Sequence, residues 1–170
     1  SKARRSAQSA MFIILDALVK LLAPVIAFTA EEIWKYMPHY ANDDVRSVMF
    51  SSMPKTNAEY DNEALEEKWN KIIEVRNDVN KALEIARNDK LIGKPLDAEV
   101  EVFASGELYE LLKSMESELA EIFITSKASV SDNDAENAYA GDVVKVKVEA
   151  SKYEKCGRCW VHSETVGTVE

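Results

Sequence analysis

The 170-residue sequence predicts an α+β protein, in which a helical bundle is followed by a small β-α-β-β unit and a short tail. Apolar residues recur at three- and four-residue spacing in two long segments of residues 1–96, as in amphipathic helices. After Leu96 the period changes to two, which is typical of a half-buried strand. With only 5 Gly and 4 Pro and 46% hydrophobic residues, a disordered or collagen-like chain is excluded.

The first predicted helix is the most apolar part of the chain and ends near Leu22, because Pro24 lacks a backbone N–H. Residues 10–30 are apolar enough to be mistaken for a membrane span. However, Asp16 and Lys20 would each cost about 2.5–3.5 kcal/mol at its centre, so we expect no membrane partner. The apolar positions of this segment share one helical face: Met11, Ile14, Leu18, Leu21, Val25 and Phe28.

A shorter helix is predicted to follow this break. Thr29 and Glu32 have the capping-box form, in which a hydroxyl and a carboxylate satisfy free N–H groups at a helix start. Pro38 then ends the helix. Residues 39–61 lose periodicity and collect turn-forming residues, so we expect a surface connection with one short strand at residues 48–50.

A second long helix is predicted between this connection and Gly93-Lys94-Pro95. Its apolar stripe consists of Leu65, Trp69, Ile72, Val79, Leu83 and Ala86. Arg76 interrupts the stripe, and a guanidinium at such a place needs a partner. We expect either a ligand phosphate or a carboxylate of the first two helices, the candidates being Asp16, Glu31 and Glu32.

The β-α-β-β unit is predicted from alternating strands around one helix. The expected elements are a strand over residues 98–102, a helix over 107–120 and strands over 122–130 and 143–148, with an acidic loop over 132–142. The predicted domains are therefore the helical part at 1–96, a junction unit at 97–151 and a tail without a core at 152–170.

The formal net charge of −9 at first argues against a nucleic-acid partner, but it is unevenly distributed. Residues 1–96 carry 14 basic and 14 acidic side chains, whereas residues 97–170 carry 7 and 16. All the acidic excess thus lies in the second part, and the helical part is free to present basic patches. The cations that we single out as nucleic-acid contacts are Arg76, Arg87, Lys90 and Lys94.

The most specific local motif is the run from Cys156 to Cys159, the two cysteines of the chain. Two thiolates with two residues between them can bind one Zn²⁺, but a structural site needs four ligands, so we expect half a site. A thioredoxin-like redox pair, incidental spacing and His162 as a third ligand remain alternatives. Two cysteines form no disulfide framework of a secreted protein, so we expect a reducing, cytoplasmic location.

Trp160 and Arg158 flank this motif in a tail too short to bury them. An indole beside a guanidinium can stack an unpaired base and hold its phosphate. The alternative is that Trp160 packs on the sheet, whereas Trp34 and Trp69 lie at helical core spacing and are predicted core residues. The sequence contains no Gly-rich phosphate loop, catalytic carboxylate pair or nucleophile beside a base, so we expect no catalysis by this chain alone.

Four segments together resemble the C-terminal region of bacterial isoleucyl-tRNA synthetases. They are Arg4–Gln8 (RRSAQ), Leu22–Trp34 (LAPVIAFTAEEIW), Ala86–Lys94 (ARNDKLIGK) and Cys156–Trp160 (CGRCW). The second segment is shared with the valine and leucine enzymes of the same class I branch, so the equivalent region of those ligases is an alternative. The tail motif indicates the isoleucine enzyme.

The resemblance implies an anticodon-binding helical bundle, a small junction unit and a zinc-binding tail, which together hold the anticodon stem-loop of isoleucine tRNA. In the family four cysteines hold the zinc, and only Cys156 and Cys159 are found here. The parent enzyme would activate isoleucine with ATP and Mg²⁺, charge the tRNA and edit valine, but its ATP-binding signatures are absent from this sequence. The expected partners are isoleucine tRNA and the rest of the synthetase, in a monomer.

Two readings from other classes remain as alternatives. A zinc-knuckle adaptor would use the acidic second part for contact with another protein. A DNA-repair glycosylase tail would use a similar zinc finger on duplex DNA, but the helical first half has no place in that reading.

Overall fold

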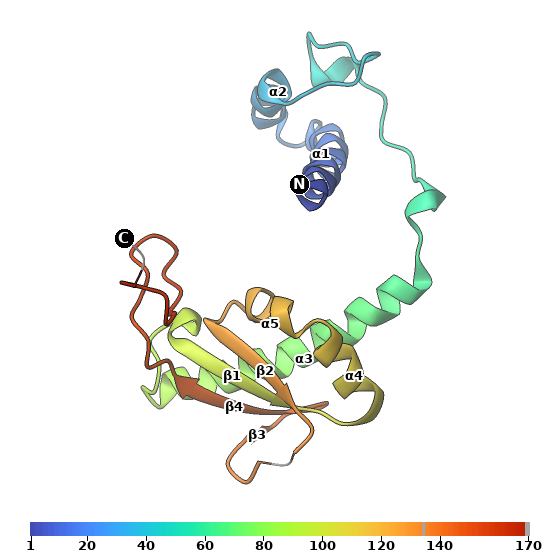
Figure 1. Ribbon diagram of the computed structural model, residues 1–170. Coiled ribbons are helices and arrows are strands. Elements are labelled where there is room, and N and C mark those ends of the chain that lie inside the picture. The colour runs from blue at the N-terminus through green and yellow to red at the C-terminus, as the bar shows by residue number, and fades with distance from the viewer. Residues whose placement is uncertain (134, 169–170) are drawn as a thin grey trace. The chain divides into compact units, whose positions relative to one another are not determined.

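The computed structural model describes residues 1–133 and 135–168 and confirms an α+β chain (Figure 1). The chain forms two compact units, Ser1–Asp61 and Asn62–Glu170. The predicted acidic loop includes Asp134 and the predicted tail includes Val169 and Glu170, all three of which lie outside the described residues. Among the described residues, no helix has both the length and the apolar character needed to cross a membrane.

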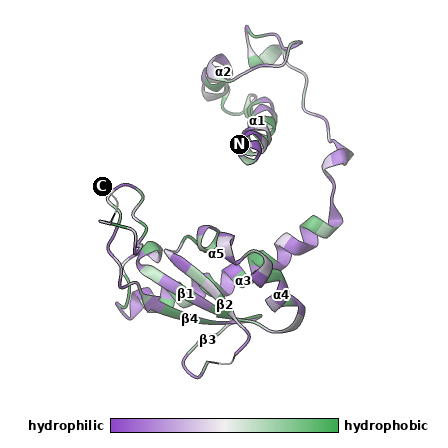
Figure 2. Cartoon of the chain, in the orientation of Figure 1, coloured by the Kyte–Doolittle hydropathy of each residue, from purple (hydrophilic) through white to green (hydrophobic). Residues whose placement is uncertain are grey.

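The first unit contains two α-helices, α1 (Lys2–Leu22) and α2 (Ala27–Tyr36), and two short 3₁₀ turns, η1 (Val48–Phe50) and η2 (Ala58–Tyr60). As predicted, α1 ends just before Pro24, and α2 ends just before Pro38. The two helices and η1 share a small core of Val19, Ala23, Ala30, Trp34, Met37 and Val48. Hydrophobic and hydrophilic residues alternate around α1 (Figure 2), and its apolar positions outside this core, such as Met11 at 69%, are exposed.

Two local predictions in this unit are wrong. The helix α2 begins at Ala27, because Ala30 N–H already donates to the carbonyl of Ile26, and Thr29 therefore lies inside the helix and caps nothing. Residues 48–50 form a 3₁₀ turn instead of a strand. Ser47 starts that turn by accepting the Met49 N–H at 3.1 Å.

The second unit begins with the predicted long helix, α3 (Glu63–Asn88), which Asn62 caps by accepting the Leu65 N–H. Its C-terminal two thirds pack on the sheet, and Ile72, Val75 and Val79 are fully buried. Each such side chain stabilises the fold by about 1.5–3 kcal/mol. The sheet does not reach the first turns of α3, where Trp69 is 42% exposed, contrary to its prediction as a core residue, whereas Trp34 is buried as predicted.

The sheet has the strand order β2-β1-β4-β3. Its strands are β1 (Ala98–Phe103), β2 (Lys127–Ser131), β3 (Tyr139–Ala140) and β4 (Lys145–Ala150). β1 runs parallel to β2, with Val100 opposite Ala128, and antiparallel to β4, with Val100 opposite Val148. The helices α4 (Gly106–Ser114) and α5 (Glu116–Phe123) connect β1 to β2, and Figure 1 shows α3 crossing behind the strands. Burial alternates along β1, so one face of the sheet is packed.

Three predictions in this unit need correction. The helix expected over residues 107–120 is two helices, because the chain breaks at Met115. The strand expected from Ile122 begins only at Lys127, since Ile122 and Phe123 end α5 and Ile124 takes a left-handed conformation (φ 59°). The predicted acidic loop contains the two-residue strand β3.

The compact division of the chain also differs from the predicted boundary at residue 96. It falls at Asp61, because α3 buries its apolar face against β4, β1 and α5 and so belongs with the sheet.

Candidate nucleic-acid interface

The tail presents an exposed indole close to two lysines. Trp160 is 54% exposed. Lys94 Nζ lies 5.2 Å from the centroid of its ring, and Lys155 Nζ lies 5.6 Å from it. Both distances are within the range of a cation–π contact. We call these three residues the Trp160 platform. The exposure of the indole does not support the alternative in which it packs on the sheet.

The tail turn directs this indole outward. Cys156 N–H donates to the carbonyl of Val161 at 2.9 Å, and Trp160 N–H donates to the carbonyl of Cys156 at 3.0 Å. These bonds close a tight turn in which Trp160 has a left-handed backbone (φ 66°). This conformation costs about 1–2 kcal/mol for a residue with a Cβ, so the turn must be held by its surroundings.

Asp97 joins the tail to the turn that carries Lys94. This residue ends the short 3₁₀ turn η3 (Pro95–Asp97), and its Oδ2 accepts the N–H groups of Lys94 at 2.8 Å and Gly93 at 3.1 Å. Its Oδ1 lies 3.5 Å from His162 Nε2 in the tail. The hydrogen bond from Lys94 is the main cause that lowers the pKa of Asp97; burial opposes it, and the Gly93 N–H with the charges of Lys155 and His162 adds to the lowering.

Arg87 and Lys90 lie at the end of α3, next to the platform in the sequence. Arg87 is exposed, with its Nη2 only 4.0 Å from Glu84 Oε1 on the same helix. Asp89 ends the helix, Lys90 has a left-handed backbone (φ 62°), and Leu91 N–H returns to the carbonyl of Ala86. Figure 1 shows the turn after α3 and the tail at the same end of the unit. Both cations are therefore solvated and available to a polyanion.

Arg76 has a partner within its own unit, which is a backbone carbonyl and not a carboxylate. The structure places its Nε 3.0 Å from the carbonyl oxygen of Ile122, at the end of α5. A cation at this position favours the negative end of a helix dipole, so Arg76 ties α3 to α5. Asp16 instead pairs with Lys20 at 2.8 Å, and Glu31 accepts the hydroxyl of Ser47.

The two cysteines are free thiols in the tail turn. The backbone N–H groups of Cys159 and Arg158 are the main cause that lowers the pKa of the Cys156 thiol, and the Cys159 side chain and Trp160 N–H add to it, against burial. His162 does not complete a site, because its ring nitrogens face Tyr153 and Asp97. Among the described residues, no group of three or more His, Cys, Asp or Glu is placed to hold a metal ion. By residue type, the two thiols are two of the four ligands that a structural zinc site needs.

Comparison with known proteins now identifies the family. Residues 1–102 match the family model described as the anticodon-binding domain of tRNA ligase. The chain belongs to this family. The matched range includes Lys94, whereas Trp160 and the cysteines lie beyond it.

Relatives of this anticodon-binding chain cover its whole length. It is 47% identical to the isoleucine–tRNA ligase of Caldanaerobacter subterraneus subsp. tengcongensis and 45% identical to that of Thermoanaerobacter sp. (strain X514). It is 38% identical to the enzyme of Natranaerobius thermophilus. All of the chain is covered in each case, but it spans only 19% of the length of each ligase. These findings confirm the resemblance and favour it over the adaptor and DNA-glycosylase alternatives.

Sequence reasoning missed a buried carboxylate in this anticodon-binding chain. Asp78 of α3 is 1% exposed, and its carboxylate accepts the N–H groups of Asp142 at 3.0 Å, Val143 at 2.8 Å and Val144 at 3.2 Å. A Cβ on Gly141 would lie only 2.3 Å from Asp78 Cγ, so the loop needs glycine there. The stripe gave no signal for Asp78, because Asp78 is the neighbour of Val79 in the sequence and does not itself occupy a stripe position, as Arg76 does.

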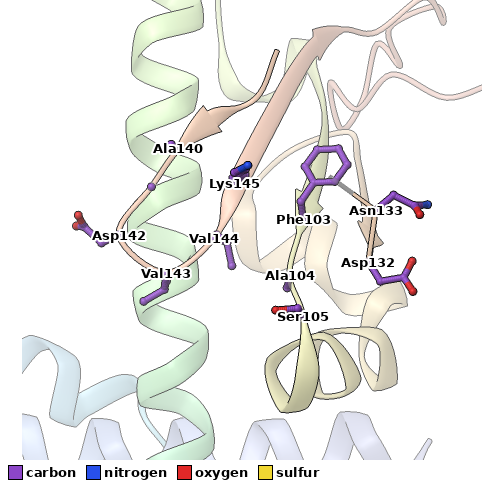
Figure 3. Close-up of a pocket in the computed structure, with 11 residues that line it drawn as sticks. Phe103, Ala104, Ser105, Asp132, Asn133, Ala140, Asp142, Val143, Val144 and Lys145 are labelled. Carbon is purple, nitrogen blue, oxygen red and sulfur yellow. The ribbon is translucent and has the colours of Figure 1, made fainter. Parts of the chain in front are cut away.

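Beside this loop lies a pocket of about 370 Å³, shown in Figure 3. Phe103 and Ser105 line it next to the end of β1, with Asp132 and Asn133 on one side of them in the view and Asp142 and Val143 on the other. Asp132 and Asp142 contribute two carboxylates and Lys145 one ammonium group, so acidic side chains outnumber basic ones in the lining. The Trp160 platform is the better candidate for contact with a nucleic acid.

Proposed function

We propose that the chain is the anticodon-binding part of an isoleucine–tRNA ligase and that it holds the anticodon stem-loop of isoleucine tRNA at the Trp160 platform. One observation carries this proposal: an indole that is 54% exposed lies within cation–π distance of the ammonium groups of Lys94 and Lys155. The parent ligase would activate isoleucine with ATP and Mg²⁺ elsewhere and act as a monomer. The role of this chain is to fix the position of the tRNA.

The platform suits an unpaired base of an RNA loop. Stacking of one base on an aromatic ring contributes about 1–3 kcal/mol and tolerates any base. The two ammonium groups and the exposed guanidinium of Arg158, two residues before Trp160, supply positive charge for the adjoining phosphates. Local cations therefore outweigh the formal net charge of −9 at this surface.

The remaining predicted tRNA contacts have unequal support. Arg87 and Lys90 are exposed at the end of α3, where they suit phosphate contacts. Arg76 is half-buried and already donates from Nε to Ile122, so we assign it a structural role first and a contact with tRNA second.

In the ligase, Cys156 and Cys159 would hold Zn²⁺ together with two further ligands from outside this chain. The metal would supply a structural cross-link, because zinc in a closed four-ligand site performs no catalysis. The residues of the chain itself already shape the turn, through the backbone bonds between Cys156 and Val161 and between Trp160 and Cys156.

Filter binding of the full-length ligase to isoleucine tRNA, with a tRNA of different anticodon as competitor, tests the proposal. We expect a clear preference for isoleucine tRNA at moderate salt. Trp160→Ala should weaken binding about tenfold or more, since the loss of stacking exceeds about 1.4 kcal/mol. Trp160→Phe should retain most of the affinity because it keeps an aromatic face.

Tyr153→Ala is the matched control, because Tyr153 is a 40% exposed aromatic residue of the same tail outside the platform. The Tyr153→Ala ligase should bind isoleucine tRNA with the same affinity as the unmodified ligase. Equal losses in Tyr153→Ala and Trp160→Ala, or no preference between the two tRNAs, would contradict the proposal.

A further inference from the structure

The contacts between the tail and the turn before β1 point to two residues that set the geometry of the platform. We propose that Asp97 and His162 are positioning residues for the anticodon contact: together they hold Trp160 against Lys94. This inference rests on the proposed function for its consequence in tRNA binding. Its structural part stands on contacts within the second unit and can be tested without RNA.

Asp97 holds both halves of the platform. On one side, its Oδ2 fixes the backbone of Gly93 and Lys94, at 3.1 and 2.8 Å, and so fixes the origin of the Lys94 side chain. On the other side, its backbone carbonyl accepts the N–H of Ser151 at 2.8 Å, where the chain leaves β4 for the tail. Its Oδ1 then faces His162 at 3.5 Å. One residue therefore meets the lysine turn, the start of the tail and its return segment.

His162 anchors the return segment that follows Trp160. Its backbone N–H donates to Ser126 Oγ at 2.7 Å, and the hydroxyl of Ser126 donates to the carbonyl of Leu96, next to Asp97. His162 also pairs with Lys155 in a short antiparallel bridge. The position of His162 therefore affects Lys155, which pairs with it, and Trp160, which lies two residues before it.

The two ring nitrogens of His162 both face acceptors. Nδ1 lies 2.7 Å from the carbonyl oxygen of Tyr153, which can only accept, so Nδ1 must carry a proton. Nε2, on the other side of the ring, is buried and lies 3.5 Å from Asp97 Oδ1. The ring of His162 therefore lies between Tyr153 in the tail and Asp97 before β1.

Asp97 Oδ1 and His162 Nε2, 3.5 Å apart, form a side-chain contact between the lysine turn and the tail. Loss of either side chain should therefore change the position of Trp160 relative to Lys94.

NMR of the three indole N–H groups in the 170-residue chain tests the structural part, with the Trp160 signal assigned from Trp160→Phe. Asp97→Asn and His162→Gln should each shift the Trp160 signal from its position in the unmodified chain, because each changes the contact that holds the tail beside Lys94. If the Trp160 signal is unchanged in both variants, the inference is overturned.

Two controls accompany this measurement. Asp89→Asn makes the same substitution in the connection between α3 and β1, at an exposed residue outside these contacts, and should leave the Trp160 signal in place. Trp69 lies on α3 in the second unit. Its signal should be the same in every variant, which shows that the second unit remains folded.

The consequence for tRNA is measured separately in the full-length ligase. Asp97→Asn should weaken binding to isoleucine tRNA about tenfold, equivalent to about 1.4 kcal/mol, whereas Asp89→Asn should leave the affinity unchanged. If the Trp160 signal responds but the tRNA affinity does not, the positioning contact stands and the proposed anticodon contact fails. If neither responds, the positioning role itself is refuted.

Discussion

At the scale of single residues, Asp78 shows how one buried carboxylate can organise a loop. Burial raises the pKa of Asp78, but the N–H groups of Val143, Asp142 and Val144 and the charge of Lys81 outweigh this effect, so the pKa is lowered from its ordinary value of 3.8. A carboxyl group with a lowered folded-state pKa stabilises the fold above its unfolded-state pKa. This stabilisation is lost as the pH falls below about 4 and through the folded-state pKa.

Replacement of Asp78 should therefore change both stability and its pH dependence. Asp78→Ala leaves three buried N–H groups without an acceptor and should lower the free energy of unfolding by about 3 kcal/mol at neutral pH. Asp78→Asn should cost less and should remove part of the loss of stability below about pH 4. Urea unfolding at several pH values measures both effects.

Asp142→Asn provides the control for this series, because the Asp142 side chain is 83% exposed and only pairs with Lys81 at the surface. A surface pair contributes about 0–1 kcal/mol, so this variant should unfold nearly like the unmodified chain. If Asp142→Asn lowers the free energy of unfolding as much as Asp78→Ala does, the surface pair of Asp142 with Lys81 holds the loop and Asp78 does not.

At the scale of elements, β2 is an edge strand that the protein protects with a helix side chain. Val130 N–H donates to Glu116 Oε1 of α5 at 2.9 Å, and Lys113 Nζ holds the other carboxylate oxygen of Glu116 at 2.7 Å. An unprotected edge N–H is a template for pairing with another chain. Glu116→Ala should therefore lower the free energy of unfolding by about 1–2 kcal/mol and promote concentration-dependent association.

Light scattering alongside thermal unfolding detects both effects, and Glu118→Ala, an exposed position on the same helix, is the control. If Glu116→Ala associates no more than Glu118→Ala at equal concentration, Glu116 does not protect the edge.

The elements also show where sequence patterns are sufficient. The helices α1 and α3 and the strand β1 were predictable, because each repeats its period over several turns or residue pairs. The strand predicted from Ile122 failed because a short apolar run reads equally well as the end of a helix. Phe123 is the last residue of α5 and is buried, and the left-handed Ile124 then turns the chain towards β2. Sequence alone could not show this turn, because Ile rarely adopts that conformation.

At the scale of the whole molecule, the sequence predicted two of the three platform residues, Lys94 and Trp160, but neither Lys155 nor the arrangement of the three. Lys94 and Trp160 lie in separate segments that the docking of the tail brings together, with Asp97 and His162 among the contacts. No periodicity reports such a contact. The partner of Arg76 could not be predicted for a related reason: its Nε donates to a backbone carbonyl, which any residue provides.

The charge distribution makes a final prediction that separates the cations of the platform from its indole. Binding to tRNA releases about 0.7–0.9 counterions per neutralised phosphate, so a few placed cations give a modest slope of log K against log salt concentration. Lys94→Gln and Lys155→Gln should each reduce that slope by about 1. Trp160→Ala should weaken binding equally at every salt concentration, because stacking releases no counterions.

Filter binding of the full-length ligase between low and physiological salt measures both the slope and the affinity. If the slope is unchanged in both lysine variants, other cations contact the phosphates. Because the formal net charge is −9, those contacts must still come from a local cluster of cations.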